Sequence, residues 1–305
     1  MLIILIIFIN YKLNKVNNTE IENNKIKIAT IFTGSGLGDK SFNDLIYDGL
    51  LMAQKELDIE FDYSEPIHEE DYEKSILEFA ETEEYELIIA IGPEQEEAVK
   101  SVLEKYPNQK FTLIDSTLEK ENVSSIYTRW EEQAFLNGVI AGLLAKYEFE
   151  KTGEIKKAGV IIGMDMPHLN EGALGFEAGY KYVFKEGEVL KASVDNFKNP
   201  LKAKEIALLM YSNDVKYIQH LAGASGLGVF SAAREAKGYA FGVDDNQNNL
   251  DPTVVISTAV REMNKIIFDE IKDIKEEKWE DGIHYSGLKE GIIDITLEGS
   301  EVLIS

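Results

Sequence analysis

Residues 25–43 read KIKIATIFTGSGLGDKSFN, an apolar segment that runs directly into a glycine-rich loop. We predict a strand over Lys25–Phe32, with the loop Thr33–Asn43 leaving its carboxyl end. The same succession of apolar strand, polar loop and helix recurs along the chain, with further strands predicted at residues 86–91, 110–114, 124–128, 157–162, 189–194, 216–220 and 239–243. Apolar strands that alternate with helices are typical of parallel sheets covered on both faces.

The pattern runs twice, once before Thr128 and once after Glu131. It contains too many units for one doubly wound sheet, and 305 residues suffice for two domains. The sequence therefore predicts an α/β protein with two lobes. In open α/β sheets, ligands bind beyond the carboxyl ends of the strands, so the loops at these strand ends are the candidate site.

The composition excludes several classes of function. The chain has 31 Lys plus Arg against 55 Asp plus Glu, a formal net charge of −24, which would repel the phosphate backbone of a nucleic acid. It contains no cysteine, so disulfides, thiolate nucleophiles, cysteine-based zinc sites and lipid attachment through cysteine are all excluded for the sequence as given. A hydrophobic fraction of 44% is ordinary for a folded protein.

The first 25 residues differ in character from the rest. Residues 1–9 are uniformly apolar, and as a helix they would rise only about 14 Å, too short to cross a hydrocarbon core of about 30 Å. The length fits the apolar part of an export signal or its remnant, followed by a polar tether over residues 10–25. A buried first strand and a wrongly assigned start codon are the alternatives.

The loops after the predicted strands share Gly, Asp, Asn and aromatic residues; they are residues 33–43, 115–116, 195–197, 222–228 and 244–247. Carboxylates accept hydrogen bonds from hydroxyls, glycines let backbone N–H groups approach, and aromatic rings stack on a flat ligand. These loops therefore suit a hydroxyl-rich ligand that contains a ring.

No motif predicts catalysis, a metal or a cofactor. The loop after the first strand fails the G-x-G-x-x-G dinucleotide pattern, because Asp39 stands where the third glycine belongs, and no P-loop or G-x-S-x-G motif occurs. Ser225 between glycines is interpreted as a helix N-cap, and Glu94 as a first-turn carboxylate favoured by the helix dipole. Trp130, at the junction of the two halves, is either core or a wall of the cleft. The histidines are scattered, which predicts surface or loop positions for His68, His168, His220 and His284.

The loops resemble one family in an ordered series of motifs. Gly38–Asn43 (GDKSFN) is similar to the D-D-K-S-F-N segment of the basic membrane protein family, which comprises PnrA-like nucleoside-binding lipoproteins of ABC transporters. The resemblance covers residues 26–296 and continues through residues 106–111 (YPNQKF), 114–116 (IDS), 131–138 (EEQAFLNG), 222–229 (AGASGLGV), 242–247 (GVDDNQ) and 287–291 (GLKEG).

The resemblance implies a type I periplasmic-binding fold, with two Rossmann-like lobes and three crossovers. We expect these crossovers near Tyr127–Glu131, Asn246–Asp251 and Trp279–Tyr285. The first lobe would then hold residues 26–127 plus 249–281, and the second residues 129–246 plus 286–305. The family relation also implies an extracytoplasmic, membrane-associated monomer that serves an ABC permease and needs no cofactor.

Family members bind a purine nucleoside between the lobes. By resemblance, Phe42 and Phe197 would sandwich the base, Asn43 would contact the base edge, and Asp115 and Asp244 would accept from the ribose hydroxyls, helped by the backbone of Gly223–Gly226. The full expected ligand-binding set is Thr33, Asp39, Phe42, Asn43, Asp115, Trp130, Phe197, Gly223, Gly226, Asp244 and Arg261.

Three departures from the family pattern leave alternatives open. Thr33 stands where the family has a base-contacting aspartate, Arg261 replaces a ribose-contacting lysine, and the cysteine that carries the lipid anchor is absent. A sugar or small signalling molecule is therefore an alternative ligand. An intracellular or surface sensor of the same fold, and an enzyme on a two-lobe α/β scaffold, are the alternative classes of function.

Overall fold

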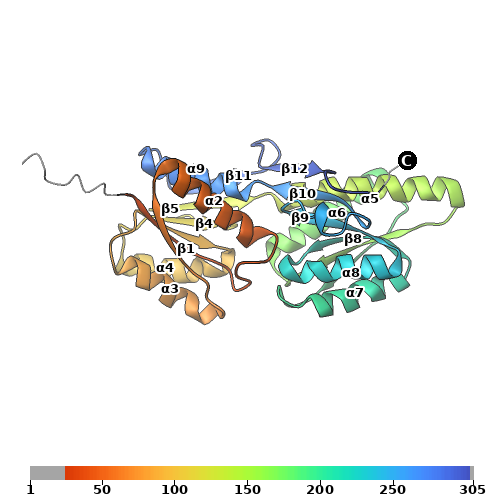
Figure 1. Cartoon of the computed structure of the whole chain (residues 1–305), viewed down its shortest axis with the longest axis horizontal. Coiled ribbons are helices and arrows are strands. Elements are labelled where there is room, and N and C mark those ends of the chain that lie inside the picture. The colour runs from red at the N-terminus through yellow and green to blue at the C-terminus, as the bar shows by residue number, and fades with distance from the viewer. Residues whose placement is uncertain (1–24, 303–305) are drawn as a thin grey trace, which may run out of the picture.

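The computed structural model describes residues 25–302, so the predicted export signal and nearly all of the predicted tether lie outside the described residues. The described chain forms two α/β lobes side by side (Figure 1). Each lobe contains a six-stranded sheet, as the recurring strand–loop–helix pattern predicts. Among residues 25–302, no helix combines the length and apolar character needed to cross a membrane.

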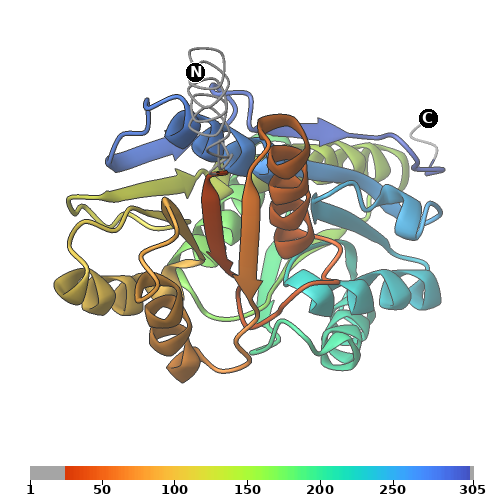
Figure 2. The same ribbon diagram turned by 60° about the vertical axis from the view of Figure 1, so that its left-hand side comes forward.

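The first lobe has a wholly parallel sheet in the order β11-β5-β4-β3-β1-β2. Its strands are β1 (Lys27–Ile31), β2 (Glu60–Ser64), β3 (Leu87–Ile91), β4 (Phe111–Ile114), β5 (Val123–Thr128) and β11 (Gly282–Ser286). Helices α2 (Phe42–Leu57) and α9 (Met263–Lys275) pack on one face, and α3 (Tyr72–Ala80) and α4 (Glu96–Lys105) on the other (Figure 2). The sequence of β3, LIIAI, is buried throughout because helices cover both faces.

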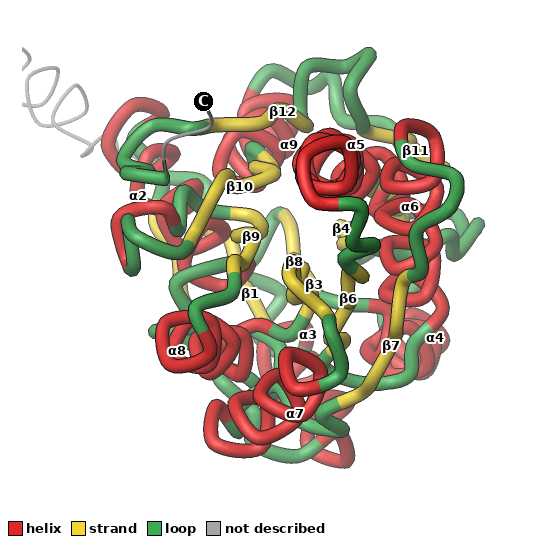
Figure 3. The backbone as a smooth tube through the Cα atoms, turned by 90° about the vertical axis from the view of Figure 1, so that its right-hand side faces the viewer, coloured by secondary structure: helices red, strands yellow, loops and turns green. Residues whose placement is uncertain are grey.

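The second lobe has the sheet order β12-β10-β9-β8-β6-β7. Its strands are β6 (Lys157–Ile162), β7 (Val189–Ser193), β8 (Val215–Leu221), β9 (Tyr239–Asp244), β10 (Val255–Arg261) and the antiparallel edge strand β12 (Ile293–Thr296). Helices α5 (Trp130–Thr152) and α6 (Pro167–Val183) cover one face, and α7 (Pro200–Ser212) and α8 (Leu227–Ala236) the other (Figure 3).

The chain crosses between the lobes after β5, after β10 and after β11. The first crossing lies where it was expected. The other two correct the predicted boundaries: β10 belongs to the second lobe, although residues 249–281 were assigned to the first, and β11 extends the first lobe to Ser286. The reason is strand pairing, because β10 is a buried strand that pairs with β9 and β12, whereas β11 pairs with β5.

Helices α5 and α6 approach until their backbones touch. The contact uses glycines on both helices, where an added Cβ would overlap the backbone of the opposite helix: Gly138 and Gly142 on α5, and Gly175 and Gly179 on α6. Only a residue without a side chain fits at so short a separation. This pair of helices forms the wall of the second lobe beside the first crossing and carries Trp130 at its start.

We expect Gly179→Ala to destabilise the protein by about 1–3 kcal/mol, because the new methyl group would overlap the carbonyl oxygen of Phe135. The direction of the change in stability is informative, because replacing glycine by alanine in an unconstrained helix stabilises the protein by about 1 kcal/mol. Urea unfolding measures the difference, with Leu174→Ala as a control because Leu174 is exposed on the same helix. A stabilised Gly179→Ala variant would contradict the close packing of α5 and α6.

Candidate functional site

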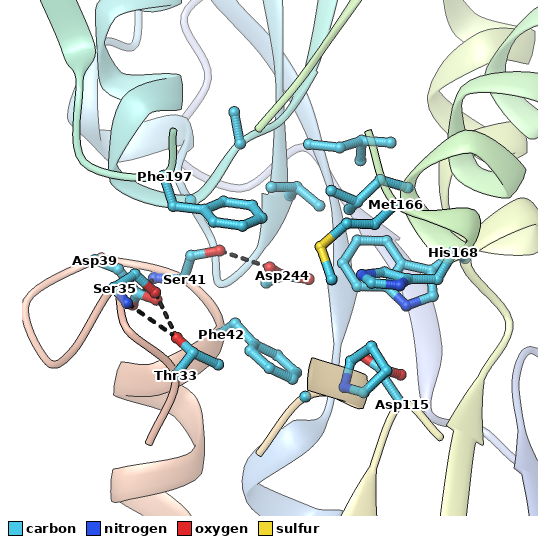
Figure 4. Close-up of a pocket in the computed structure, with 18 of the residues that line it drawn as sticks. Thr33, Ser35, Asp39, Ser41, Phe42, Asp115, Met166, His168, Phe197 and Asp244 are labelled. Atoms are coloured by element: carbon cyan, nitrogen blue, oxygen red, sulfur yellow. Dashed lines mark hydrogen bonds between the residues drawn. The ribbon is translucent and has the colours of Figure 1, made fainter. Parts of the chain in front are cut away.

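A pocket lies between the lobes at the carboxyl ends of their parallel strands (Figure 4). The first lobe contributes the loops after β1, β3 and β4, and the second lobe contributes those after β6, β7, β8 and β9. The lining residues are Thr33, Ser35, Asp39, Ser41, Phe42, Gly92, Pro93, Glu94, Asp115, Trp130, Met166, His168, Leu169, Phe197, Leu221, Ala222, Gly223, Val243 and Asp244.

Eight of the expected ligand-binding residues line this pocket: Thr33, Asp39, Phe42, Asp115, Trp130, Phe197, Gly223 and Asp244. The other three lie behind its walls. Asn43 is fully buried in the first lobe, Arg261 is buried between the lobes, and an added Cβ at Gly226 would overlap the ring of His220. These three residues do not line the pocket, so the structure does not support direct contact between them and a ligand.

Two phenylalanine rings face the pocket from opposite lobes (Figure 4). Phe42 begins α2, and Phe197 lies in the loop after β7. The Phe197 ring packs so closely on Gly163 that a Cβ there would overlap it, whereas a Cβ added at Gly223 would meet the same side chain at ordinary van der Waals distance. Glycine at position 163 thus allows the ring to reach the pocket. A flat ring could be held between Phe42 and Phe197.

Asn43 organises the loop after β1. Its Nδ2, which carries two N–H groups, lies within hydrogen-bond distance of Thr33 Oγ1 (3.0 Å), Ser35 Oγ (2.8 Å) and Asp39 Oδ2 (3.0 Å). Its Oδ1 accepts from the Thr33 backbone N–H at 3.3 Å. The amide is therefore occupied within the loop. Asp39 also accepts from the backbone N–H groups of Ser41 and Asn43. Burial raises the pKa of Asp39 to about 6 despite these bonds.

Arg261 connects carboxylates from both lobes. Its Nε donates to Asp244 Oδ1 at 2.7 Å, and its Nη1 lies 3.3 Å from Asp115 Oδ2 and 2.6 Å from Thr128 Oγ1. Its Nη2 is buried without a hydrogen-bond partner among the described residues. Burial alone would raise the pKa of Asp244, but the Arg261 charge and bonds from Ser41, Arg261 and Gln133 hold that pKa below its usual value.

The guanidinium also lies against aromatic rings. It sits 3.8 Å from the centroid of the Trp130 ring and 5.0 Å from that of Phe42, both within range of cation–π attraction. Trp130 is 6% exposed and lines the pocket, so the two interpretations of this residue, core and cleft wall, are both correct. Arg261 thus fixes the position of a ring on each lobe.

Both aspartates sit at strand ends in the left-handed backbone region, with φ of 58° at Asp115 and 65° at Asp244. Aspartate tolerates this conformation better than most residues, and such a turn aims the side chain away from the strand direction. The backbone conformation and the bonds to Arg261 together orient both carboxylates at the pocket.

Two hydrogen bonds join the lobes across the mouth of the site. Ser41 Oγ donates to Asp244 Oδ2 at 2.6 Å, and Gln247 Nε2 donates to the Lys40 carbonyl oxygen at 2.9 Å. Ser41 and Lys40 belong to the glycine-rich loop of the first lobe, whereas Asp244 and Gln247 lie at and after the end of β9 in the second. The two lobes are therefore in direct contact at the site.

Several sequence-based predictions were wrong. His168 and His220 are buried, at 8% and 0% exposure, and not surface or loop residues; His168 lines the pocket and His220 Nε2 bonds to Gln247 Oε1 at 2.8 Å. Ser225 does not cap α8, because its hydroxyl donates to the Asn196 carbonyl and accepts from the Asn199 N–H, which secures the Phe197 loop.

Glu94 and Met166 also line the pocket and were not predicted to do so. Burial raises the pKa of Glu94 to about 7, although its own backbone N–H donates to it. Each comes after a parallel strand on the side of its carboxyl end, Glu94 after β3 and Met166 after β6. Their positions after predicted strands are the signal in the sequence that would have identified them, had the loops after these two strands also been considered.

We expect Arg261→Met to destabilise the protein by about 3–5 kcal/mol, because Asp115 and Asp244 would remain buried without a counter-charge. Urea unfolding at pH 7 measures the loss. Lys74→Met, which removes an exposed pair with Glu78, is the control and should change stability by less than about 1 kcal/mol.

The pH dependence of that loss has a defined sign. In the wild type, the pKa of Asp244 is lower in the folded protein than in the unfolded chain, and this difference stabilises the fold at pH values above the unfolded-state pKa. That stabilisation is lost as pH falls through the folded-state pKa. Without Arg261 the pKa of this carboxyl rises, so the folded variant takes up protons before the unfolded chain and gains relative stability on acidification. The difference in the free energy of unfolding between wild type and Arg261→Met should become smaller from pH 7 to pH 5. A difference that stays constant over this range would contradict the ionic role of Arg261.

Comparison with known proteins identifies the family. The profile of a family described as ABC transporter substrate-binding protein PnrA-like matches residues 25–304. An uncharacterized lipoprotein of Pyrococcus abyssi is 33% identical over 89% of this chain and 69% of its own, and basic membrane protein A of Borreliella burgdorferi is 30% identical over 88% and 78%.

Solved structures agree. A solute-binding protein of an ABC transporter system from Aeropyrum pernix K1 superimposes with a TM-score of 0.84 at 30% identity, over 89% of this chain and 76% of its own. The resemblance drawn from the ordered motifs is confirmed, and so is the α/β fold of the type I periplasmic-binding class. The chain belongs to the PnrA-like family of ABC transporter substrate-binding proteins.

Proposed function

We propose that the protein binds a nucleoside, with purine nucleosides preferred, between its lobes and delivers it to an ABC permease. The observation that carries this proposal is the pair of Phe42 and Phe197 rings on opposite sides of one pocket that also contains the carboxylates of Asp115 and Asp244. The rings suit a flat base, and the carboxylates suit the hydroxyls of a sugar.

The charge of the pocket favours a nucleoside over a nucleotide. The lining includes Asp39, Glu94, Asp115 and Asp244, while the guanidinium of Arg261 is already shared between two of them. A phosphate group would meet carboxylates without a free cation in the pocket lining to balance it. A neutral nucleoside meets no such repulsion, which is consistent with the net charge of −24.

Binding by closure requires no bond chemistry. A ligand that contacts both lobes stabilises the closed arrangement through its higher affinity for that state. The contacts of Ser41 with Asp244 and of Lys40 with Gln247 would form as the lobes approach. We propose that the protein acts as a monomer outside the cytoplasm and near the membrane, where it would meet the permease; cell fractionation tests this location.

A second candidate ligand is a sugar or small signalling molecule. Thr33 lines the pocket with a neutral hydroxyl that already exchanges hydrogen bonds with Ser35 and Asn43. A hydroxyl offers fewer acceptor sites than a carboxylate, so base selectivity through this position would be weak. A sugar would use the carboxylates and leave the two phenylalanine rings to pack on its apolar face.

Isothermal titration of ligand-stripped protein with adenosine, guanosine, inosine, uridine and cytidine should give binding heat, strongest with the purines because the larger base covers more of both rings. Ribose and glucose are titrated in a parallel experiment, which tests the alternative that the ligand is a sugar. Removal of co-purified ligand by unfolding and refolding is a necessary control. Heat with the sugars and with none of the five nucleosides would refute the nucleoside proposal.

Phe42→Ala should weaken nucleoside binding at least tenfold, because one stacking surface is lost together with its buried area. The fold should survive, since Phe42 is only partly buried and packs against a core that is built from other residues, and circular dichroism checks this. Tyr182→Ala, an exposed aromatic on α6, is the matched control. An affinity unchanged by Phe42→Ala would show that the base binds elsewhere.

A further inference from the structure

His168 is a buried polar residue whose hydrogen bonding is incomplete. It lies in the first turn of α6, is 8% exposed and lines the pocket between the lobes. Its ring is tilted by 50° against Trp130, with centroids 5.1 Å apart, and Figure 4 shows it beside Met166 at the end of the pocket near Asp115. Among residues 25–302, neither ring nitrogen has a hydrogen-bond partner, and neither is fully enclosed by the protein.

The comparison with His220 shows why this matters. His220 is fully buried; its Nε2 bonds to Gln247 within the second lobe, and its Nδ1 is enclosed without a partner among the described residues. The ring nitrogens of His168 differ from this enclosed atom, because they have no partner among the described residues and still keep accessible surface. Because the ring of His168 borders the pocket, a molecule in the pocket can supply that partner.

Asp115, at the same end of the pocket, has unused accepting capacity. Its Oδ1 accepts from the backbone N–H and the hydroxyl of Thr128, whereas its Oδ2 has only the Arg261 Nη1 at 3.3 Å. Burial lowers the pKa of the His168 imidazole, with the Asp115 charge as the largest opposing influence, so the imidazole is neutral near pH 7. A neutral imidazole offers one N–H donor and one acceptor.

We propose that His168 and Asp115 together bind one hydroxyl group of the ligand, which makes His168 a specificity residue for hydroxylated sugars. The hydroxyl donates a hydrogen bond to Asp115 Oδ2 and accepts a hydrogen bond from the imidazole N–H. This inference rests on the proposed nucleoside function and deepens it: the ligand is a ribonucleoside whose sugar carries a free hydroxyl at the His168 end of the pocket.

The hydrogen-bonding role can be separated from mere packing against Trp130. His168→Phe keeps an aromatic ring of similar size but removes both ring nitrogens, whereas His168→Asn keeps a donor and an acceptor. The ligands are adenosine and its 2′-deoxy, 3′-deoxy and 5′-deoxy analogues, titrated into ligand-stripped protein.

The wild type should bind one of the three analogues at least tenfold more weakly than adenosine. His168→Phe should bind adenosine at least tenfold more weakly than the wild type does and should lose its discrimination against that same analogue. His168→Asn should recover part of the discrimination, which a packing role would not do. Equal discrimination by wild type and His168→Phe would overturn the proposal.

A measurement on the wild type avoids any folding defect of a variant. The ¹⁵N shifts of the His168 ring should change when adenosine is added and change less with the discriminated analogue; His168→Asn assigns the signal among the four histidines. No shift with adenosine, where calorimetry detects binding, refutes the role of His168 alone. Absence of binding by every nucleoside and analogue refutes the proposed function together with this one.

Discussion

The buried ion network of Arg261 with Asp115 and Asp244 is the interaction on which the site depends. It joins the carboxyl end of β4 in the first lobe to that of β9 in the second, through a side chain at the end of β10, just before a crossing. Buried charges are costly unless they are paired, so the geometry that pairs all three groups is strongly favoured. The same guanidinium positions Trp130 and Phe42 through contacts with their rings.

This network ties closure of the lobes to the chemistry of the pocket. Asp244 receives bonds from Arg261 and Gln133 and, across the cleft, from Ser41. Separation of the lobes would break the Ser41 bond and the bond between Lys40 and Gln247, and would admit water to the charges. Under the proposed function, a ligand that contacts both lobes adds its own free energy to these contacts between the lobes.

Sequence reasoning selected several residues that share one pocket, because parallel strands end at one edge of each sheet. Phe42, Asp115 and Asp244 were found by inspecting the loop at the carboxyl end of each strand, and the structure places all three at one pocket. The loops after β3 and β6 were not among those considered, and Glu94 and His168 were given the structural explanations that are common for a first-turn glutamate and a single histidine. Sequence reasoning also misplaced β10, since the pairing partners β9 and β12 cannot be deduced from an isolated apolar segment.

The sequence by itself determined the α/β class, the division into two lobes and the family, because strand periodicity, loop composition and motif order are local properties. Only the tertiary structure decided that Arg261 serves carboxylates of both lobes, that Asn43 supports its own loop, and that His168 borders the pocket without a partner among the described residues. These facts depend on distances between residues that are far apart in the chain, or on whether a side chain points into the pocket or into the protein behind it. Packing sets both, and no single stretch of sequence encodes them.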